Sequence, residues 1–555
     1  MNAVLPVPAI WTTGTTEGIH TGTWRAATPR HIVAPSPCHQ ACPVGGEIAT
    51  WIGQARNGDT HGAWLTLLKH NPFPSIAGRI CHHPCEAACN RGGHDEALSI
   101  CRLERYVGDQ ALEQGWAVPA PAAHPAAGHV AVVGGGPAGL SAAYQLRRMG
   151  HRVSLYEASE ELGGVMRYGI PAYRLSRSVL DAEIARIVAS GVEVHCGHAV
   201  VGAEALERLA ATHDAVFVAL GAQQPKALPQ IDATRPWFMD GARYLAASAR
   251  GEPPPLGARV LVVGGGSAAI DVARSARRAG HAVTLLALER EKQMPAQRDE
   301  VVEALEEGIT LVDGAMLRSV SEGAALTLHC QRVEFLPGAE RGRFELRPLQ
   351  GSEFTLEVDA VLTAIGQDPR LDDLGAALRR SGPLLWMDAQ GQTSDARIWA
   401  GGDLASMARF VTEAVGMGER AARAIDRRLR ERAGVGPAAD AAPSSEPVVP
   451  LSAISLHYHP QQARAASPRR PAAERMADQD EVQLGLDVAK ALAEAQRCFS
   501  CGSCIHCDQC VIYCPDLAVQ RIGEGYRVNT DYCKGCGVCV RECPTGSMAM
   551  SEDTK

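Results

Sequence analysis

The sequence has no long run of basic residues, and its charges nearly balance. It holds 54 Lys and Arg against 62 Asp and Glu, which gives a formal net charge of -8. Nucleic acids and anionic membrane surfaces attract proteins through concentrated positive charge. We therefore expect neither as a partner.

The first residues, MNAVLPVPAIW, do not show the basic start, apolar core and small-residue cleavage site of a secretory signal. We expect the protein in the cytoplasm. A membrane-spanning helix is not predicted either, because the apolar stretch Val130–Leu146 is short for a bilayer and residues 134–137 (GGGP) interrupt it. This stretch is interpreted as a buried strand followed by a turn.

Without a secretory signal, disulfides are not expected, yet the chain has 18 cysteines. Six fall between Cys38 and Cys101 and ten between Cys498 and Cys543, and such clustering favours metal binding. Cys196 and Cys330 lie outside both groups and are expected to be ordinary buried thiols.

The C-terminal cysteines form two copies of C-x2-C-x2-C-x3-C-P, displaced by 29 residues. In this pattern three thiolates bind one [4Fe-4S] cluster and the fourth binds its neighbour, whereas a zinc ribbon would use two separated C-x2-C pairs. The predicted ligand sets are Cys504, Cys507, Cys510 and Cys543 for one cluster, and Cys533, Cys536, Cys539 and Cys514 for the other. Cys498 and Cys501 continue the spacing upstream, and either packing thiols or ligands would fit them.

Between His129 and about Arg432, short β-rich runs alternate with helical segments, which is typical of parallel sheets built from βαβ units. Gly134, Gly136 and Gly139 form G-x-G-x-x-G between the strand HVAVV and a helix predicted over residues 140–149. This loop permits a pyrophosphate to approach a helix N-terminus. Glu157 ends the next strand, where an acidic residue would bind a ribose hydroxyl.

A second fingerprint comprises Gly264, Gly266 and Ala269, the last in place of the third glycine. It too lies between a strand and a helix. Two fingerprints predict two dinucleotides, most simply a flavin and a nicotinamide, although a structural copy that has lost its ligand is the alternative.

Several segments resemble the glutamate synthase small subunit family, which includes the reductase halves of dihydropyrimidine dehydrogenase and of ferredoxin-dependent transhydrogenases. The resemblance covers about Cys38 to Arg432 and is carried by NPFPSIAGRICHHPCEAACNRG, GGGPAGLSAAYQL, ELGGVMRYGIPAYRL, VALGA, GGGSAAIDVARSA, AIGQDP and AGGD. It implies FAD at the first fingerprint and NAD(P)H at the second, with the nicotinamide domain inserted into the flavin domain. The implied FAD residues beyond the first fingerprint are Glu157, Gly163, Gly164, Gly402, Asp403 and Thr412, the last in a helix over Val411–Ala422. The implied NAD residues beyond the second fingerprint are Glu289 and Gly366.

The family usually holds two N-terminal [4Fe-4S] clusters, one of them using a C-x2-C pair upstream. This chain has no cysteine before Cys38, so the resemblance implies only one N-terminal cluster. Its implied ligands are Cys42, Cys81, Cys85 and Glu104, with Cys38, Cys89 and Cys101 left spare or one of them replacing Glu104. Alternatively, Glu104 is an exposed helix residue.

Relatives that use NADPH have two arginines after the second strand of the nicotinamide unit, where this sequence has Leu288 and Glu289. A carboxylate there accepts a hydrogen bond from a free 2′-hydroxyl and repels a 2′-phosphate. We therefore predict NADH preference, although Arg290 and Lys292 lie close enough to keep NADPH open.

The predicted fold is α/β, with two Rossmann-like domains between a helical N-terminal iron-sulfur domain and an α+β ferredoxin-like C-terminal domain. The expected boundaries are 1–120 for the N-terminal domain, 128–235 and 385–432 for the two FAD segments, 236–384 for the NAD(P) domain, 433–490 for a linker and connecting segment, and 491–555 for the ferredoxin-like domain.

The predicted activity is flavin-mediated electron exchange between NAD(P)H and a ferredoxin or larger redox enzyme, with no protein side chain acting in catalysis. Electrons would pass through FAD, the N-terminal cluster and the two C-terminal clusters, in either direction. Fusion to a ferredoxin-like tail resembles electron-transfer subunits of 2-oxoacid:ferredoxin oxidoreductases and similar enzymes, so we expect a hetero-oligomer. The alternatives are a glutamate synthase small subunit and a relay subunit without nicotinamide turnover.

Overall fold

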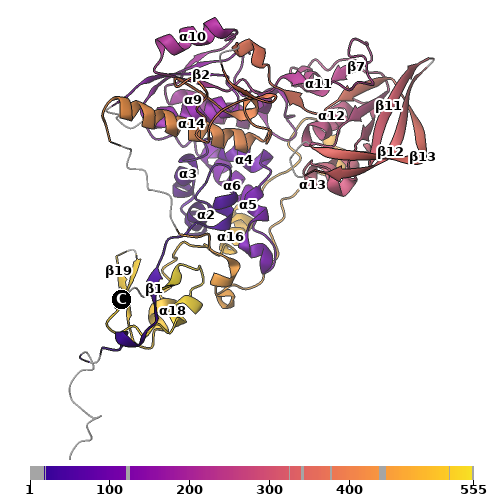
Figure 1. Cartoon of the computed structure of the whole chain (residues 1–555). Coiled ribbons are helices and arrows are strands. Elements are labelled where there is room, and N and C mark those ends of the chain that lie inside the picture. The colour runs from indigo at the N-terminus through magenta and orange to yellow at the C-terminus, as the bar shows by residue number, and fades with distance from the viewer. Residues whose placement is uncertain are drawn as a thin grey trace, which may run out of the picture.

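The computed structural model describes residues 18, 20–120, 126–323, 325–338, 343–375, 378–436, 446–523 and 525–552. Figure 1 shows an elongated molecule in which two nucleotide-binding units lie side by side at one end. The ferredoxin-like unit lies at the other end, and the helical domain separates them. Within the described ranges, no helix has the length and apolar character needed to cross a bilayer.

The helical domain is built from short helices around Trp51 and Trp64, which are fully buried. Gly78 and Gly108 let two of these helices pack closely, because a Cβ on Gly78 would lie 2.3 Å from the backbone nitrogen of Arg105. The elements are α1 (Pro37–Ala41), α2 (Ile48–Arg56), α3 (Thr60–Leu68), α4 (Pro74–Ile80), α5 (Pro84–Ala87), the 3-10 helix η3 (Asn90–Gly93) and α6 (Ile100–Glu113).

The first nucleotide-binding unit is a five-stranded parallel sheet of order β18-β5-β2-β3-β4. Its strands are β2 (His129–Val133), β3 (Arg152–Tyr156), β4 (Glu193–His195), β5 (Ala215–Val218) and β18 (Ile398–Ala400), and its helices are α7 (Pro137–Arg148), α8 (Val165–Tyr168), α9 (Arg177–Ala189), α10 (Ala203–Thr212) and α14 (Val411–Arg432). The helix predicted over residues 140–149 begins earlier, because Pro137 is well suited to a first helical turn. The helix predicted over Val411–Ala422 continues to Arg432.

The second unit is also a five-stranded parallel sheet, of order β10-β9-β8-β14-β7. Its elements are β7 (Phe238–Asp240), α11 (Gly241–Ala249), β8 (Arg259–Val263), α12 (Ser267–Arg278), β9 (Ala282–Leu286), α13 (Arg298–Glu306), β10 (Thr310–Val312) and β14 (Ala360–Thr363). A three-stranded antiparallel sheet extends from it, formed by β11 (Ala315–Glu322), β12 (Leu326–Pro337) and β13 (Phe344–Val358). Because β18 returns to the first sheet after this unit, the second unit is inserted into the first, as the sequence predicts.

Residues 446–490 pack against three other parts of the molecule. The backbone N–H of Val482 donates to the carbonyl oxygen of Tyr173 at 2.9 Å, and Arg475 pairs with Glu306 at 2.8 Å. Glu481 accepts from Arg105 at 2.9 Å. Within the predicted linker and connecting segment, residues 446–490 therefore form a packed connection, while residues 437–445 lie outside the described residues.

The ferredoxin-like unit contains both ends of the described chain. Strand β1 (Ala27–His31) pairs antiparallel with β21 (Met548–Glu552), which the sequence does not predict. The other elements after residue 446 are the 3-10 helices η7 (Leu451–Ala453) and η8 (Leu456–Tyr458), followed by α15 (Ala472–Arg475), α16 (Val488–Gln496), α17 (Gln509–Ile512), β19 (Val519–Ile522), β20 (Gly525–Val528) and α18 (Val538–Arg541). The two chain ends thus form one folded unit.

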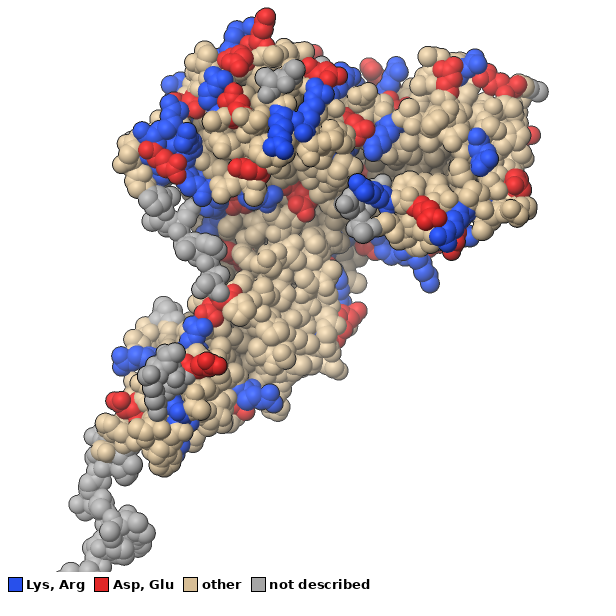
Figure 2. Space-filling view, in the orientation of Figure 1, with Lys and Arg blue, Asp and Glu red and all other residues tan. Residues whose placement is uncertain are grey.

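Figure 2 shows basic and acidic side chains interspersed over both nucleotide-binding units, and fewer charges on the visible face of the helical domain. On that face neither sign forms a continuous field.

Candidate functional site

The first glycine loop fits a bound dinucleotide. A Cβ on Gly134 would lie 2.3 Å from the carbonyl oxygen of Ala219, and one on Gly139 only 1.8 Å from that of Gly134. Space beside Gly136 is open, since its nearest neighbour would be the Gly164 Cα at 4.0 Å. These contacts require glycine for a tight turn and leave room where the pyrophosphate would lie.

Glu157 lies beside this loop, as predicted for the acid that binds a ribose. Its carboxylate accepts from the backbone N–H groups of Gly135 at 2.6 Å and Ser159 at 2.8 Å. The Gly163 N–H donates to the carbonyl oxygen of Gly135 at 2.8 Å, which brings the predicted glycine pair against the same loop. Gly163 and Gly164 both have positive φ, 123° and 52°.

The remaining residues expected at FAD come from the returning strand β18 and the start of α14. Gly402 has φ of 73°, and a Cβ on it would lie 3.1 Å from that of Ala138, the second residue of α7. Burial raises the pKa of the Asp403 carboxyl, and Arg409 opposes that shift. Thr412 lies in the first turn of α14. Gly402 therefore lies beside the start of α7 at the first glycine loop, although more than 250 positions separate the two in the sequence.

The second glycine loop has the same construction. Gly264 has φ of 144°, and a Cβ on it would lie 2.5 Å from the carbonyl oxygen of Ala364, while Gly266 faces open space. A Cβ on Gly265 would lie 2.4 Å from a carboxylate oxygen of Glu289, so this acid occupies the position that Glu157 has in the first unit. Burial raises the pKa of the Glu289 carboxyl.

Other residues of the second loop lie at its edges. Ala269 is fully buried, so its methyl group replaces the third glycine without blocking the open space at Gly266. Gly366 has φ of 105° and lies beside Lys226, just after β14. The exposed Arg290 is held by Asp313 at 3.4 Å.

Cys81 and His82 contact both nucleotide-binding units. The Cys81 thiol lies 3.6 Å from the Thr412 hydroxyl, and the His82 ring lies 4.0 Å from that of Phe410 between centroids. On the other side, His82 is 3.4 Å from the hydroxyl of Ser267, the residue that follows Gly266. This segment therefore connects the helical domain to both dinucleotide loops, which the sequence alone does not reveal.

The predicted N-terminal ligands gather in one place. Burial, followed by the nearby Glu104 carboxylate, raises the pKa of Cys42 to about 11 and that of Cys81 to about 12. Burial, followed by the nearby Cys42 and Cys81 thiols, also raises the pKa of Cys85. Glu104 itself is partly buried and accepts from Asn71 at 2.8 Å, so the alternative of an exposed helix residue is wrong. Burial raises the pKa of Glu104 to about 7.

Two cavities in the ferredoxin-like unit are each lined by four cysteines. One contains Cys504, Cys507, Cys510 and Cys543, and the other contains Cys514, Cys533, Cys536 and Cys539. Each holds about 300 Å³ of space between protein atoms, part of it open to solvent. The members of each set are those expected from the motif with the fourth cysteine crossing over, so the residues fit two clusters.

Other cysteines have different surroundings. The Cys101 thiol is buried and donates to the carbonyl oxygens of Ala77 and Gly78, at 3.6 and 3.3 Å, as a packing residue would. Cys330 is buried as predicted, whereas Cys196 is exposed after the end of β4, so the prediction of a buried thiol is wrong there. Cys38 and Cys89 line one cavity together with Cys498 and Cys501.

Comparisons with known proteins agree with this division of the chain. Residues 128–418 match the family described as pyridine nucleotide-disulphide oxidoreductase. Residues 30–116 match the dihydropyrimidine dehydrogenase domain II, 4Fe-4S cluster family, and residues 503–547 match the 4Fe-4S dicluster domain family. The cofactor classes predicted from the sequence are thereby confirmed.

Three relatives share about a third of their aligned residues with the chain. The NADP(+)-dependent formate dehydrogenase subunit beta of Moorella thermoacetica is 33% identical over 84% of this chain and 70% of the relative. The NAD-dependent dihydropyrimidine dehydrogenase subunit PreT of Escherichia coli O157:H7 is 32% identical over 70% and 90%. The NADPH-Fe(3+) oxidoreductase subunit beta of Geobacter sulfurreducens is 33% identical over 71% and 64%.

Proposed function

The chain belongs to the pyridine nucleotide-disulphide oxidoreductase family, and from this premise we propose that it exchanges electrons between NADH and a partner redox protein. The route runs through FAD, the N-terminal cluster and the ferredoxin-like clusters. FAD accepts a hydride as two electrons, whereas each cluster carries one electron, so the combination connects the two kinds of carrier.

The contact of Cys81 with Thr412 carries this proposal. It joins an expected cluster ligand to the first turn of the helix expected beside FAD, at 3.6 Å. His82 extends the same segment toward Ser267 at the second glycine loop. These contacts support the proposal, because one junction would keep the expected sites of the hydride donor, the flavin and the first one-electron carrier close together, and fixed proximity favours transfer.

The choice of NADH rests on Glu289. Its carboxylate lies at the second glycine loop as Glu157 lies at the first, where it would accept a hydrogen bond from a ribose hydroxyl. Arg290, the nearest following cation, is paired with Asp313. A 2′-phosphate bound at this loop would therefore lie next to the Glu289 carboxylate, while Arg290 is already paired with Asp313.

We further propose that a larger redox subunit exchanges electrons at the ferredoxin-like unit. The relatives named above are subunits of a formate dehydrogenase, a dihydropyrimidine dehydrogenase and an Fe(3+) oxidoreductase. The ferredoxin-like unit lies farthest from the nucleotide-binding units, where a partner has access.

The test is anaerobic reduction of benzyl viologen by the purified holoprotein with NADH or NADPH. We expect reduction with NADH at a higher kcat/KM than with NADPH. No dye reduction with either nucleotide would eliminate a reductase and leave only a relay protein.

A further inference from the structure

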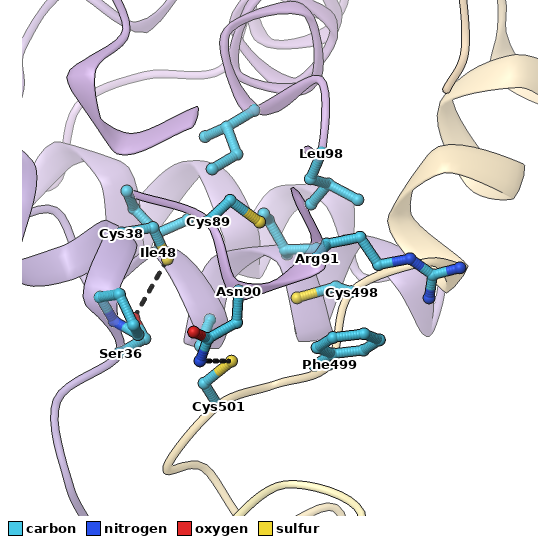
Figure 3. Close-up of a pocket in the computed structure, with 14 residues that line it drawn as sticks. Ser36, Cys38, Ile48, Cys89, Asn90, Arg91, Leu98, Cys498, Phe499 and Cys501 are labelled. Carbon is cyan, nitrogen blue, oxygen red and sulfur yellow. Dashed lines mark hydrogen bonds between the residues drawn. The ribbon is translucent and has the colours of Figure 1, made fainter. Parts of the chain in front are cut away.

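A third cavity lined by four cysteines lies where the two ends of the chain meet (Figure 3). Cys38 and Cys89 come from the helical domain, while Cys498 and Cys501 come from the segment after α16. About 370 Å³ of space between protein atoms, part of it open to solvent, lies in this cavity, compared with about 300 Å³ for each of the two ferredoxin-like cavities. It therefore has the same kind of lining as those cavities and a similar size.

We propose that Cys38, Cys89, Cys498 and Cys501 bind a further [4Fe-4S] cluster, which we call the junction cluster. It would be the fourth cluster of the chain, and each chain end would supply two of its ligands. The sequence has no cysteine before Cys38, and the C-x2-C pair at positions 498 and 501 fills that gap from the other end. The assignment of the metal site stands on these residues alone, whereas its role in electron transfer rests on the proposed function.

The backbone at Cys498 has the same local geometry as cysteines in the predicted cluster sets. In three cases the backbone N–H of the residue two positions after a cysteine donates to that cysteine's thiol: at Cys498 (3.4 Å), Cys504 (3.5 Å) and Cys81 (3.2 Å). In each case the donor residue has positive φ, which is 52° for Ser500, 54° for His506 and 36° for His83. Non-glycine residues rarely adopt this conformation, and it persists where the surrounding structure requires it. Cys498 thus begins a loop of the type that begins a cluster motif.

The charges around the cavity suit a cluster bound by thiolates. Four thiolates around a cubane carry net negative charge, and Arg56 is a nearby cation, 3.5 Å from the hydroxyl of Ser500 between Cys498 and Cys501. Arg91 also lines the cavity, but its guanidinium donates to the Asp95 carboxylate at 2.7 Å.

A single zinc ion would draw four sulfurs to about 2.3 Å from one point. Among the residues that the structure describes, no three or more His, Cys, Asp or Glu side chains are arranged to hold one metal ion. The four thiolates of a [4Fe-4S] cluster instead surround a larger cubane, and the four cysteines here line the cavity in that way. Four cysteines line each of the two ferredoxin-like cavities in the same way.

Buried polar contacts fix the two halves of the cavity to each other. Arg91 donates to the carbonyl oxygen of Arg497 at 2.8 Å, and Arg497 pairs with Asp95 at 3.1 Å. Asn90 donates to the Cys501 thiol at 3.5 Å and to the carbonyl oxygen of Val449 at 3.0 Å. The segment with Cys498 and Cys501 is therefore held in place beside Cys38 and Cys89 by residues that are not themselves ligands.

The junction cluster would adjoin the N-terminal cluster on one side and the ferredoxin-like pair on the other. Cys38 and Cys42 lie at either end of α1, about 6 Å apart along its axis. Cys501 and Cys504 are three residues apart, so their Cα atoms lie within about 11 Å. One electron at a time would enter from the Cys42 side and leave toward Cys504, so that each reduction is matched by one oxidation.

The first test compares Cys498→Ser/Cys501→Ser with the matched double variant Cys196→Ser/Cys330→Ser, each purified anaerobically as the full chain. Iron, sulfide and zinc are measured per chain, with low-temperature electron paramagnetic resonance of the dithionite-reduced proteins. We expect about 16 irons in the unaltered and control proteins and about 12 in the first variant, with the other cluster signals retained. Unchanged iron in that variant, or loss of one zinc instead, would overturn the proposal.

A second measurement uses the unaltered holoprotein in case the variant does not fold. Alkylation followed by mass spectrometry should find Cys38, Cys89, Cys498 and Cys501 protected until iron is removed, while Cys196 reacts throughout. Alkylation of these four at equal rates before and after iron removal would refute the site. NADH oxidation with ferricyanide, measured in parallel, separates the two proposals: its absence refutes the reductase while the iron count still decides the cluster.

Discussion

Replacing Glu289 by arginine should change the nucleotide preference of the enzyme. Glu289 follows β9, and its carboxylate is placed so that a Cβ on Gly265 would lie 2.4 Å from it. The substitution removes the acceptor for a ribose hydroxyl and introduces a donor for a 2′-phosphate. NADH should therefore become a poorer substrate and NADPH a better one.

The size of the change follows from the interactions exchanged. A hydrogen bond to a charged group contributes about 1.5–3 kcal/mol. Since about 1.4 kcal/mol corresponds to a tenfold change, NADH should lose about 10- to 150-fold in kcat/KM. A guanidinium contact with the 2′-phosphate would give NADPH a gain of similar size, so the ratio of the two should shift by about 10²- to 10⁴-fold.

Steady-state kinetics with both nucleotides measures this ratio, and Glu291→Arg is the control. It makes the same change of charge two residues away, where the carboxylate pairs with Arg298 at 2.6 Å. An unchanged ratio in Glu289→Arg, or an equal shift in Glu291→Arg, would refute the reasoning.

Two further predictions concern the N-terminal cluster and the stability of the second unit. Cys81→Ser should lower the iron content by about four per chain and slow viologen reduction, whereas Cys101→Ser should do neither; equal iron in both variants would contradict the ligand set. Glu307→Ala should lower the free energy of unfolding by about 3–5 kcal/mol, because the buried Arg278 loses its carboxylate partner at 2.6 Å and Arg274 keeps only Glu303. Denaturant unfolding measures this loss, and for the exposed control Glu204→Ala the loss of unfolding free energy should be less than about 1 kcal/mol. A similar loss in both variants would disprove the buried-pair argument.

Local sequence patterns predict the parts of this molecule whose determinants are close together in the chain. The ferredoxin-like cysteines follow at every third residue, so the motif predicts both the members of each set and the crossing of Cys514 and Cys543. The glycine loops are likewise defined by the strand, turn and helix that contain them, and their steric contacts explain the residue type at Gly134 and Gly139.

Features that depend on tertiary packing are not visible in this way. About 400 residues separate Cys89 from Cys498, and tertiary contacts bring the chain ends together, among them the pairing of β1 with β21 and the contacts of Arg91 with the Arg497 region. Residues 446–490 have a polar composition, but Glu481 and Arg475 use that polarity to bind other domains.

The most direct test of the proposed electron route is an anaerobic titration of the full holoprotein with NADH, followed by low-temperature electron paramagnetic resonance. The signals of the reduced ferredoxin-like clusters should appear as NADH is added, together with loss of flavin absorbance. If NADH bleached the flavin while those signals appeared only with dithionite, electrons would not pass from the nucleotide sites to the C-terminal unit.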